Sequence, residues 1–182
     1  MAIAVFFAEG FEEIEALTVV DLARREGLET WMISVTGKDK VTGSHGIVVE
    51  MDKLIEEVDF SKVEMIVLPG GMPGTLNLKA CKPLMDQVMK FYQEKRYLAA
   101  ICAAPTIFGE LGILEGKEAC CYPGMEEQLK TEKQVTSSLV VADHILTSRG
   151  MGTAIAFGLK IIEIFLGKER ADQLGKGIVY YS

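Results

Sequence analysis

The segment YLAAICAAPTIF, residues 97–108, places the thiol of Cys102 where an apolar run meets a proline. Small residues stand close to it, Ala100 before and Ala103 after, and Pro105 suits the first turn of a helix. A nucleophile on a sharp strand-to-helix turn needs small neighbours, because such a turn is strained and crowded. A helix N-terminus favours thiolate, so we expect a lowered pKa for Cys102. A buried structural cysteine is the alternative interpretation.

Another apolar run ends in the segment LPGG, which places Gly70 and Gly71 side by side. Paired glycines at the end of a strand let the backbone approach a ligand closely. If the two segments lie together, the N–H groups of Gly71 and Ala103 form an oxyanion hole beside the sulfur. A plain tight turn is the alternative, and the glycine pair alone does not separate the two.

Three carboxylates follow the first apolar run in the segment GFEEIEA. At helical spacing Glu12 and Glu15 share a face, whereas Glu13 points elsewhere. A carboxyl that turned toward the thiol would have a raised pKa and would share a proton with the sulfur. The residues alone favour a simpler interpretation, in which the acids stabilise the first turn of a helix through its dipole.

Apolar runs and helical segments alternate along the chain with short links. The runs IAVFFA and MIVLPGG resemble strands buried on both faces of a parallel sheet. Further strands are expected in TWMISV, GIVVEM, YLAAICA and KEACCY, and a hairpin-like pair in QVTSSLVVADHILTS; helices are expected at about 12–26 and 82–95, from 105, in GTAIAFGLKIIEIFLG and in ERADQLGKGIVYY. This alternation predicts one α/β domain, residues 1–182, with a mostly parallel sheet. The three segments described above then meet at the carboxyl edge of the sheet, where ligands bind.

The composition argues against several classes of function. The net charge of -7 disfavours nucleic acid or an anionic membrane as a partner, and no apolar run approaches the ~20 residues that span a bilayer. The first residues lack the basic segment of a signal peptide, and the four cysteines lack disulfide spacing, so we expect a reducing cytoplasm. His45 and His144 lie far apart and form no metal-ligand pattern, so we expect no metal.

Four segments together, AEGFEEIEA, VLPGGMPG, AAICAAPT and LTSRGMGTAIAFGLKIIE, closely resemble the ThiJ/PfpI superfamily. The nearest branch is that of the parkinsonism-linked deglycase and its bacterial relatives. The match covers nearly the whole chain in order, which makes it far more specific than any single motif. The resemblance implies a flavodoxin-like three-layer sandwich with helices on both faces of the sheet. It also implies a homodimer, in which Ile14 and its neighbours on the first helix contact the partner.

The resemblance assigns roles to the segments. Cys102 is the implied catalytic cysteine, and the acid beside its sulfur falls on Glu15, which reverses the simpler interpretation of the acidic segment. The oxyanion donors fall on Gly71 and Ala103, with Gly70 shaping the turn. The implied substrate is a small carbonyl compound such as methylglyoxal, and no cofactor is implied.

The sequence departs from the family pattern at four positions. Ala103 follows the cysteine where the protease-like and chaperone branches have histidine, so a peptidase is a poor interpretation. Tyr122 stands where the deglycase-like branch often has a histidine, and tyrosine is a poor base at neutral pH. His45 replaces an interface arginine; it would reach the partner's site, or it is an exposed loop residue, and the second interpretation is favoured. Met151 replaces a proline in a turn that we expect to persist.

Two functions remain open on this basis. The first is a glyoxalase or deglycase-like enzyme, with Cys102 as nucleophile and Glu15 as acid and base. The second is an oxidative-stress sensor or redox-regulated chaperone, in which Cys102 is oxidised to a sulfinate. The same reactive thiol serves both. Cys120 and Cys121 adjoin the expected strand KEACCY, so one should face the core and the other should face away.

Overall fold

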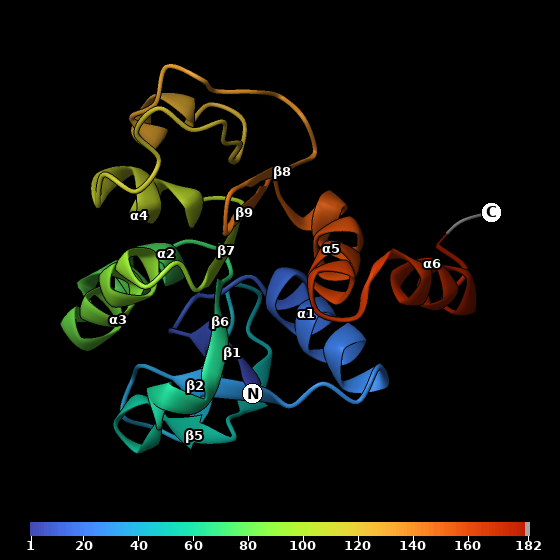
Figure 1. Ribbon diagram of the computed structural model, residues 1–182. Helices are drawn as coiled ribbons and strands as arrows, with labels where there is room; N and C mark the ends of the chain where they lie inside the picture. The colour runs from blue at the N-terminus through green and yellow to red at the C-terminus, as the bar shows by residue number, and fades with distance from the viewer. Residues whose placement is uncertain (181–182) are drawn as a thin grey trace.

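Seven strands form the main sheet in residues 1–180, the part of the chain that the computed structural model describes (Figure 1). Their order is β5-β2-β1-β6-β7-β9-β8, and neighbouring strands are parallel except for the pair β8 and β9. The strands are β1 Ala2–Phe7, β2 Thr30–Ser34, β5 Lys53–Leu54, β6 Val63–Leu68, β7 Tyr97–Ile101, β8 Leu139–Ala142 and β9 Ile145–Ser148. The predicted α/β class with a mostly parallel sheet is confirmed, as is the hairpin of the last two strands.

The central strand β1 is buried along its whole length. Ile3, Val5 and Phe7 face one hydrophobic core, whereas Ala4 and Phe6 face the other. Since alternate side chains of a strand point to opposite faces of the sheet, a strand covered on both faces must be apolar at every position. This explains the unbroken run IAVFFA.

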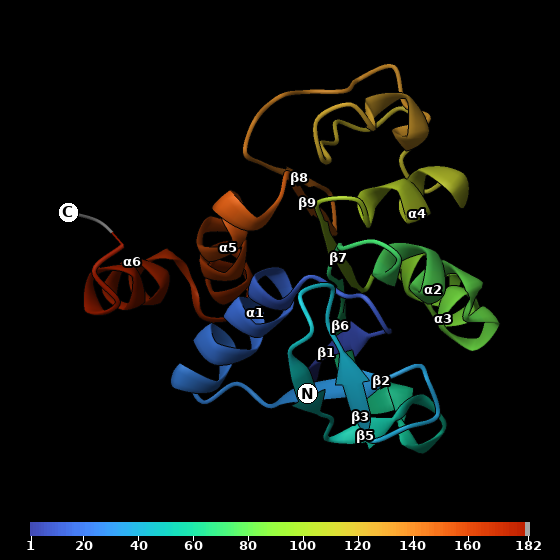
Figure 2. The same cartoon turned by 180° about the vertical axis from the view of Figure 1, so that it is seen from behind.

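Helices cover both faces of the sheet, so the molecule has three layers (Figures 1 and 2). One face carries α1 Glu13–Arg25 and α5 Ala154–Leu166, with α6 Lys168–Gly177 packed against α5. The other carries α2 Gly74–Ala80, α3 Lys82–Gln93 and α4 Pro105–Glu110. Short 3₁₀ turns lie at η1 Ile55–Glu57, η2 Phe60–Lys62, η3 Glu126–Leu129 and η4 Met151–Thr153. The helices expected from the sequence are present, but the last one ends at Gly177, and residue 181 of that prediction lies outside the described residues. α2 was not foreseen.

The helices are too short to span a bilayer. α1 and α5 have 13 residues each, whereas a membrane-spanning helix needs about 20. Within residues 1–180, no helix has both the length and the apolar character to cross a membrane.

The strand expected in GIVVEM forms outside the main sheet. β4, Val48–Glu50, pairs antiparallel with β3, Lys40–Thr42, as a separate hairpin. The hairpin is attached to the loop after β1: Gly10 N–H donates to the Thr42 carbonyl at 2.8 Å, and Ser44 N–H donates to the Phe11 carbonyl at 2.8 Å. β3 was not predicted from the sequence, because three residues are too few to show a period.

The strand expected in KEACCY is replaced by one isolated bridge, between Ala119 and Gln134. Cys120 and Cys121 are both buried, so the prediction that one of them faces away is wrong. Cys120 N–H donates to the hydroxyl of Thr147 at 3.1 Å, and Cys121 packs in a hydrophobic core. Because this segment is irregular, its side chains do not alternate between faces.

The chain order reverses at β1, because β2 lies on one side of it and β6 on the other. Val5, Val67, Ala99 and Leu146 form one row across β1, β6, β7 and β9. The loops that follow β1, β6 and β7 therefore leave the same edge of the sheet side by side. This is the edge at which open α/β sheets bind ligands.

Candidate active site

Cys102 lies at the sharp turn between β7 and α4. Its φ is 66°, in the left-handed region that costs a non-glycine residue about 1–3 kcal/mol. Its N–H donates to the Ser148 carbonyl at 3.0 Å, and its own carbonyl accepts a hydrogen bond from Tyr122 N–H at 2.8 Å. The side chain remains partly exposed. The strained turn expected from the sequence is present, held by hydrogen bonds from two other segments.

Gly70 allows three segments to meet at the sulfur. A Cβ at this position would lie 2.6 Å from the Cβ of Cys102 and 2.8 Å from Oε2 of Glu15. Any side chain here would therefore push the thiol and the carboxyl apart. Gly71 has a φ of 89°, which only glycine adopts readily, and its N–H faces the sulfur of Cys102.

Glu15 is buried, with 1% of its surface exposed, although it stands in the first turn of a helix. Its Oε2 accepts a hydrogen bond of 2.9 Å from Gly70 N–H. Its Oε1 is also buried and has no hydrogen-bond partner within residues 1–180. The carboxyl as a whole lies beside the thiol of Cys102. Burial raises the pKa of Glu15 to about 7, against the smaller lowering effects of Cys102 and Gly70.

The pKa of Cys102 is raised to about 12, so the predicted lowering is wrong. Burial is the largest cause, and the charge of Glu15 and its hydrogen bond to the thiol add to it. The N–H groups of Gly71 and Ala103 act in the opposite direction but are weaker. The prediction considered only the helix terminus. α4 has six residues, so few peptide dipoles add up there, and the carboxylate beside the sulfur outweighs them.

Cys102 and Glu15 titrate as a coupled pair. The pair loses its first proton at about pH 7 and its second at about pH 12, so it carries one negative charge between these values. Transfer of the remaining proton from sulfur to carboxylate then yields a thiolate beside a carboxylic acid. The arrangement can present a nucleophile and a proton donor together.

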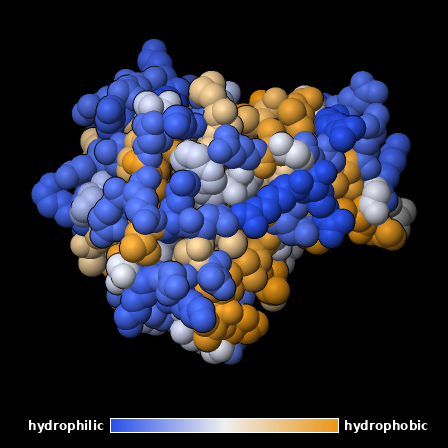
Figure 3. Space-filling view, turned by 90° about the horizontal axis from the view of Figure 1, so that it is seen from below, coloured by the Kyte–Doolittle hydropathy of each residue, from blue (hydrophilic) through white to orange (hydrophobic). Residues whose placement is uncertain are grey.

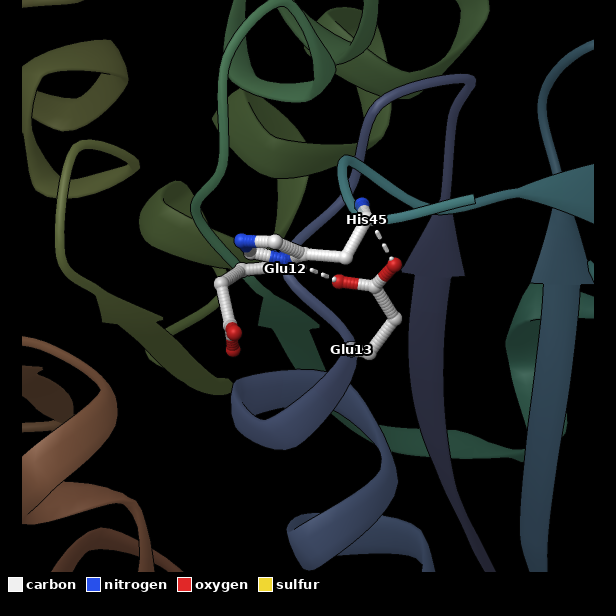
Figure 4. A group of neighbouring side chains, drawn as sticks. All are labelled: Glu12, Glu13 and His45. Carbon is white, nitrogen blue, oxygen red and sulfur yellow. Dashed lines mark hydrogen bonds and ion pairs between the residues drawn. The ribbon is translucent and has the colours of Figure 1, made fainter. Parts of the chain in front are cut away.

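The neighbouring acids Glu12 and Glu13 have structural tasks. Glu12 caps α1, with its Oε2 accepting Glu15 N–H at 2.7 Å. The buried Glu13 carboxylate binds the β3–β4 hairpin: it accepts His45 N–H at 2.7 Å and contacts His45 Nδ1 at 2.8 Å (Figure 4). It also accepts the Ser44 hydroxyl at 3.3 Å. Burial opposes ionisation of Glu13, but the hydrogen bonds from His45 outweigh it and lower the pKa. The sequence showed only an acid pointing elsewhere.

One ligand atom from each of Glu12, Glu13 and His45 lies within 4.8 Å of the others, the spacing of a metal site. Both Glu13 oxygens are already engaged by His45, and an oxygen of Glu12 caps the helix. The carboxylate also raises the pKa of His45, which favours imidazolium over the neutral ring that binds metals. The cap and the ion pair account for the positions of all three side chains.

Tyr122 and His45 contact different residues around the site. The backbone N–H of Tyr122 donates to the Cys102 carbonyl. The ring of Tyr122 and Oε1 of Glu15 both lie next to Gly150. The ring of His45 is 71% exposed and contacts Glu13 rather than Glu15. The structure therefore brings Tyr122 to the site and leaves His45 exposed on the hairpin. Whether His45 contacts a partner subunit's site stays a prediction.

A strained cysteine at the carboxyl edge of a mostly parallel sheet, with a buried carboxyl beside it, defines a flavodoxin-like α/β protein with a nucleophile elbow. Residues 1–164 match the model of the DJ-1/PfpI family, and the chain belongs to this family. The resemblance to the ThiJ/PfpI superfamily is confirmed.

Three relatives illustrate the similarity. "Protein DJ-1 homolog B" of Arabidopsis thaliana is 41% identical over 174 residues, which cover 94% of this chain but 40% of that protein; the chain thus spans about two fifths of its length. "Glutathione-independent glyoxalase DJR-1.2" of Caenorhabditis elegans is 31% identical over 170 residues, 92% of this chain and 90% of that protein. The structure "Toxoplasma gondii DJ-1, oxidized" has a TM-score of 0.95 and 33% identity, covering 100% of this chain and 99% of that one.

Proposed function

We propose that the protein is a cofactor-independent glyoxalase that converts 2-oxoaldehydes such as methylglyoxal into 2-hydroxy acids without glutathione. The observation that carries the proposal is the buried carboxyl of Glu15, with a pKa of about 7, next to the thiol of Cys102. General acid–base catalysis is most efficient when the pKa lies near the working pH. Membership of the DJ-1/PfpI family and the similarity to a glutathione-independent glyoxalase support the same activity.

The proposed reaction begins with addition of the Cys102 thiolate to the aldehyde carbon. The oxygen of the resulting hemithioacetal is stabilised by the N–H groups of Gly71 and Ala103 and receives the proton of Glu15. Glu15 then removes the proton from this carbon and delivers it to the adjacent one, while the hydroxyl proton on the first carbon passes to the oxygen of the second. The first carbon is thereby oxidised to a thioester and the second is reduced to an alcohol. Water hydrolyses the thioester, which releases the 2-hydroxy acid and restores the thiol, so one water is consumed and no redox cofactor is required.

The test is to incubate the protein with methylglyoxal in the absence of glutathione and to follow lactate by NMR. We expect lactate far in excess of the protein, and its loss in both Cys102→Ala and Glu15→Gln. Cys81→Ala is the matched control, because Cys81 is a partly buried thiol in another part of the fold. Lactate that stops at one equivalent, or that persists in Cys102→Ala, would overturn the proposal.

A deglycase-type hydrolysis of early carbonyl adducts on protein side chains would use the same thiolate and oxyanion donors. Removal of free aldehyde can imitate this activity, because the adducts are reversible. A preformed, purified adduct incubated with a chemical trap for free methylglyoxal separates the two: a rate above that of the trap alone, lost in Cys102→Ala, is the expected result for a deglycase.

Sensing of oxidation is the second candidate function. Two peroxide molecules would oxidise the Cys102 thiolate through sulfenate to sulfinate, each releasing one water. Protonated Glu15, whose Oε1 has no well-aligned hydrogen bond within residues 1–180, would donate one to a sulfinate oxygen. The similar Toxoplasma gondii structure is of an oxidized protein. Stoichiometric conversion by peroxide, seen as a mass increase of two oxygens and absent in Glu15→Gln, without lactate turnover, would favour this role.

We also propose that the protein is a homodimer through α1 and the β3–β4 hairpin. Ile14 is 49% exposed on α1, and Ile47 and Val48 are 51% and 58% exposed on the hairpin. Glu13 joins the two elements through His45. On the face seen in Figure 3, hydrophobic areas lie in several places between hydrophilic ones. Light scattering should give twice the chain mass, and Ile14→Asp should reduce it to one chain.

The proposed location is the cytoplasm. All four cysteines are free thiols, which suits a reducing compartment. Fractionation of cells that express the tagged protein, with a cytoplasmic marker alongside, checks this assignment.

A further inference from the structure

A cavity of about 490 Å³ opens beside Glu15 and has no part in the steps proposed above. Its walls come from residues within 122–138, the arch between α4 and β8 in Figure 1, and from the turn 149–153 before α5. An atom added on the Cα of Gly150 would lie 3.6 Å from the ring of Tyr122 and 3.9 Å from Oε1 of Glu15. The cavity wall therefore borders the carboxyl oxygen that lacks a well-aligned hydrogen bond.

Arg149 places a positive charge in this cavity. The other four arginines each form an ion pair with a carboxylate: Arg24 with Asp52, Arg25 with Asp21, Arg96 with Glu94 and Arg170 with Glu26. Arg149 makes one hydrogen bond, from Nη1 to the Thr136 carbonyl at 3.2 Å, and has no carboxylate partner within the described chain. A guanidinium has five N–H donors, so most of its donors remain available to a ligand.

The position of Arg149 relative to the nucleophile suits substrate binding. Ser148, the preceding residue, accepts the N–H of Cys102 at 3.0 Å, so Arg149 follows the residue that supports the elbow. The pair formed by Cys102 and Glu15 carries one negative charge and would repel an anionic substrate. A cation in the adjoining cavity offsets this repulsion and can bind a carboxylate through two parallel hydrogen bonds.

We propose that this cavity is an anion subsite, in which Arg149 binds the carboxylate of a substrate whose aldehyde reacts at Cys102. The proposal rests on the proposed glyoxalase function and narrows its substrate class. The preferred substrates are 2-oxoaldehydes that carry a carboxylate at the far end. Methylglyoxal has no such group, so it leaves the Arg149 guanidinium without a partner.

Two substrates that differ at one end test the subsite in turnover. 4,5-Dioxopentanoate ends in a carboxylate, and 2-oxopentanal has a methyl group in its place. Each takes up one water, the first to give 2-hydroxypentanedioate and the second 2-hydroxypentanoate. We expect kcat/KM to favour the anionic substrate, and Arg149→Met to lower that preference about 10- to 100-fold, the range expected for lost charge-assisted hydrogen bonds. Turnover of 2-oxopentanal should change little.

A second measurement does not require turnover. Iodoacetate and iodoacetamide alkylate the same thiol and differ in charge, so the ratio of their rates at Cys102, read by mass spectrometry, reports the local potential. Arg149→Met should lower the iodoacetate-to-iodoacetamide ratio about tenfold or more, and Arg149→Lys should restore part of it. Arg25→Met removes an equal charge from an exposed ion pair elsewhere and should leave the ratio unchanged.

The outcomes separate the two proposals. An Arg149-dependent alkylation ratio without lactate production supports the subsite and overturns the glyoxalase. Lactate production with both ratios unchanged in Arg149→Met overturns the subsite and leaves the glyoxalase standing. An equal loss of both substrates, or a change from dimer to monomer on light scattering, would assign Arg149 to a structural role and also overturn the subsite.

Discussion

The backbone N–H of Gly70 donates a hydrogen bond of 2.9 Å to Oε2 of Glu15, although 55 residues separate the two in the chain. This bond joins the end of β6 to the first turn of α1. It orients the carboxyl, so that Oε2 is occupied and Oε1 faces Gly150 in the wall of the Arg149 cavity. The absence of a side chain on Gly70 is what lets the carboxyl and the thiol approach each other.

Gly70→Ala should separate the two reactive groups. The new Cβ would lie within 3 Å of both Cys102 Cβ and Glu15 Oε2, so at least one must move. Overpacking of this kind costs about 1–3 kcal/mol of unfolding free energy, which denaturant titration will measure, and methylglyoxal turnover should be lost. Gly177→Ala is the control, because a Cβ there meets nothing within 4 Å. Wild-type turnover in Gly70→Ala would contradict the geometry.

The alkylation rate of Cys102 by iodoacetamide should rise with pH through about 7. Below this value both groups hold protons; above it the pair carries one negative charge, part of which resides on sulfur. In Glu15→Gln the thiol titrates alone, so the midpoint should move above the ordinary thiol value of about 8.5. A midpoint near 7 in both proteins would show that Glu15 does not share the proton.

Glu15 should also make the folded protein less stable as the pH rises. Its pKa is raised from 4.5 to about 7 in the folded state, so its neutral form stabilises folding below 4.5 and this contribution is lost as the pH rises through about 7. Glu15→Gln stays neutral throughout. Its unfolding free energy relative to the wild type should therefore increase by up to about 3 kcal/mol between these values. A constant difference across pH 4.5–7.5 would refute the raised pKa.

The ion pair of His45 and Glu13 should hold the β3–β4 hairpin in a defined pH window. Because the pKa of His45 is raised, the stability that its charge gives the hairpin is fully present below pH 6.5 and is lost as the pH rises through the raised pKa. Because the pKa of Glu13 is lowered, the stability that its charge gives the hairpin is fully present above pH 4.5 and is lost as the pH falls through the lowered pKa. Hydrogen exchange of residues 43–46, compared with His45→Gln at each pH, should show extra protection only inside this window. Equal exchange in both proteins at pH 5.5 would exclude the pair as an anchor.

The fold could be predicted because its signals are local. The run IAVFFA reports a strand covered on both faces, and the alternation of such runs with helical segments reports a parallel sheet. The short strand β3, the irregular segment at Cys120 and Cys121 and the short helix α2 were missed. β3 has three residues and α2 has seven, too few for a clear period. The segment at Cys120 is positioned by a distant contact, the hydrogen bond from Cys120 to Thr147, rather than by a period in its own residues.

The position of the thiol on a sharp turn is legible in the residues around it. A strained elbow needs small residues around Cys102 and tolerates Pro105 after it. A close approach to the elbow needs glycine at Gly70 and Gly71, after β6. Each of these features can be recognised in its own segment. The groups that surround the sulfur come together only when the chain folds. Three acids stand within four positions of each other, yet one caps the helix, one binds the hairpin and one is buried beside the thiol. The pKa of a group depends on burial and on charges brought together from distant segments, and for that reason the pKa of Cys102 is raised where its local sequence predicted a lowered value.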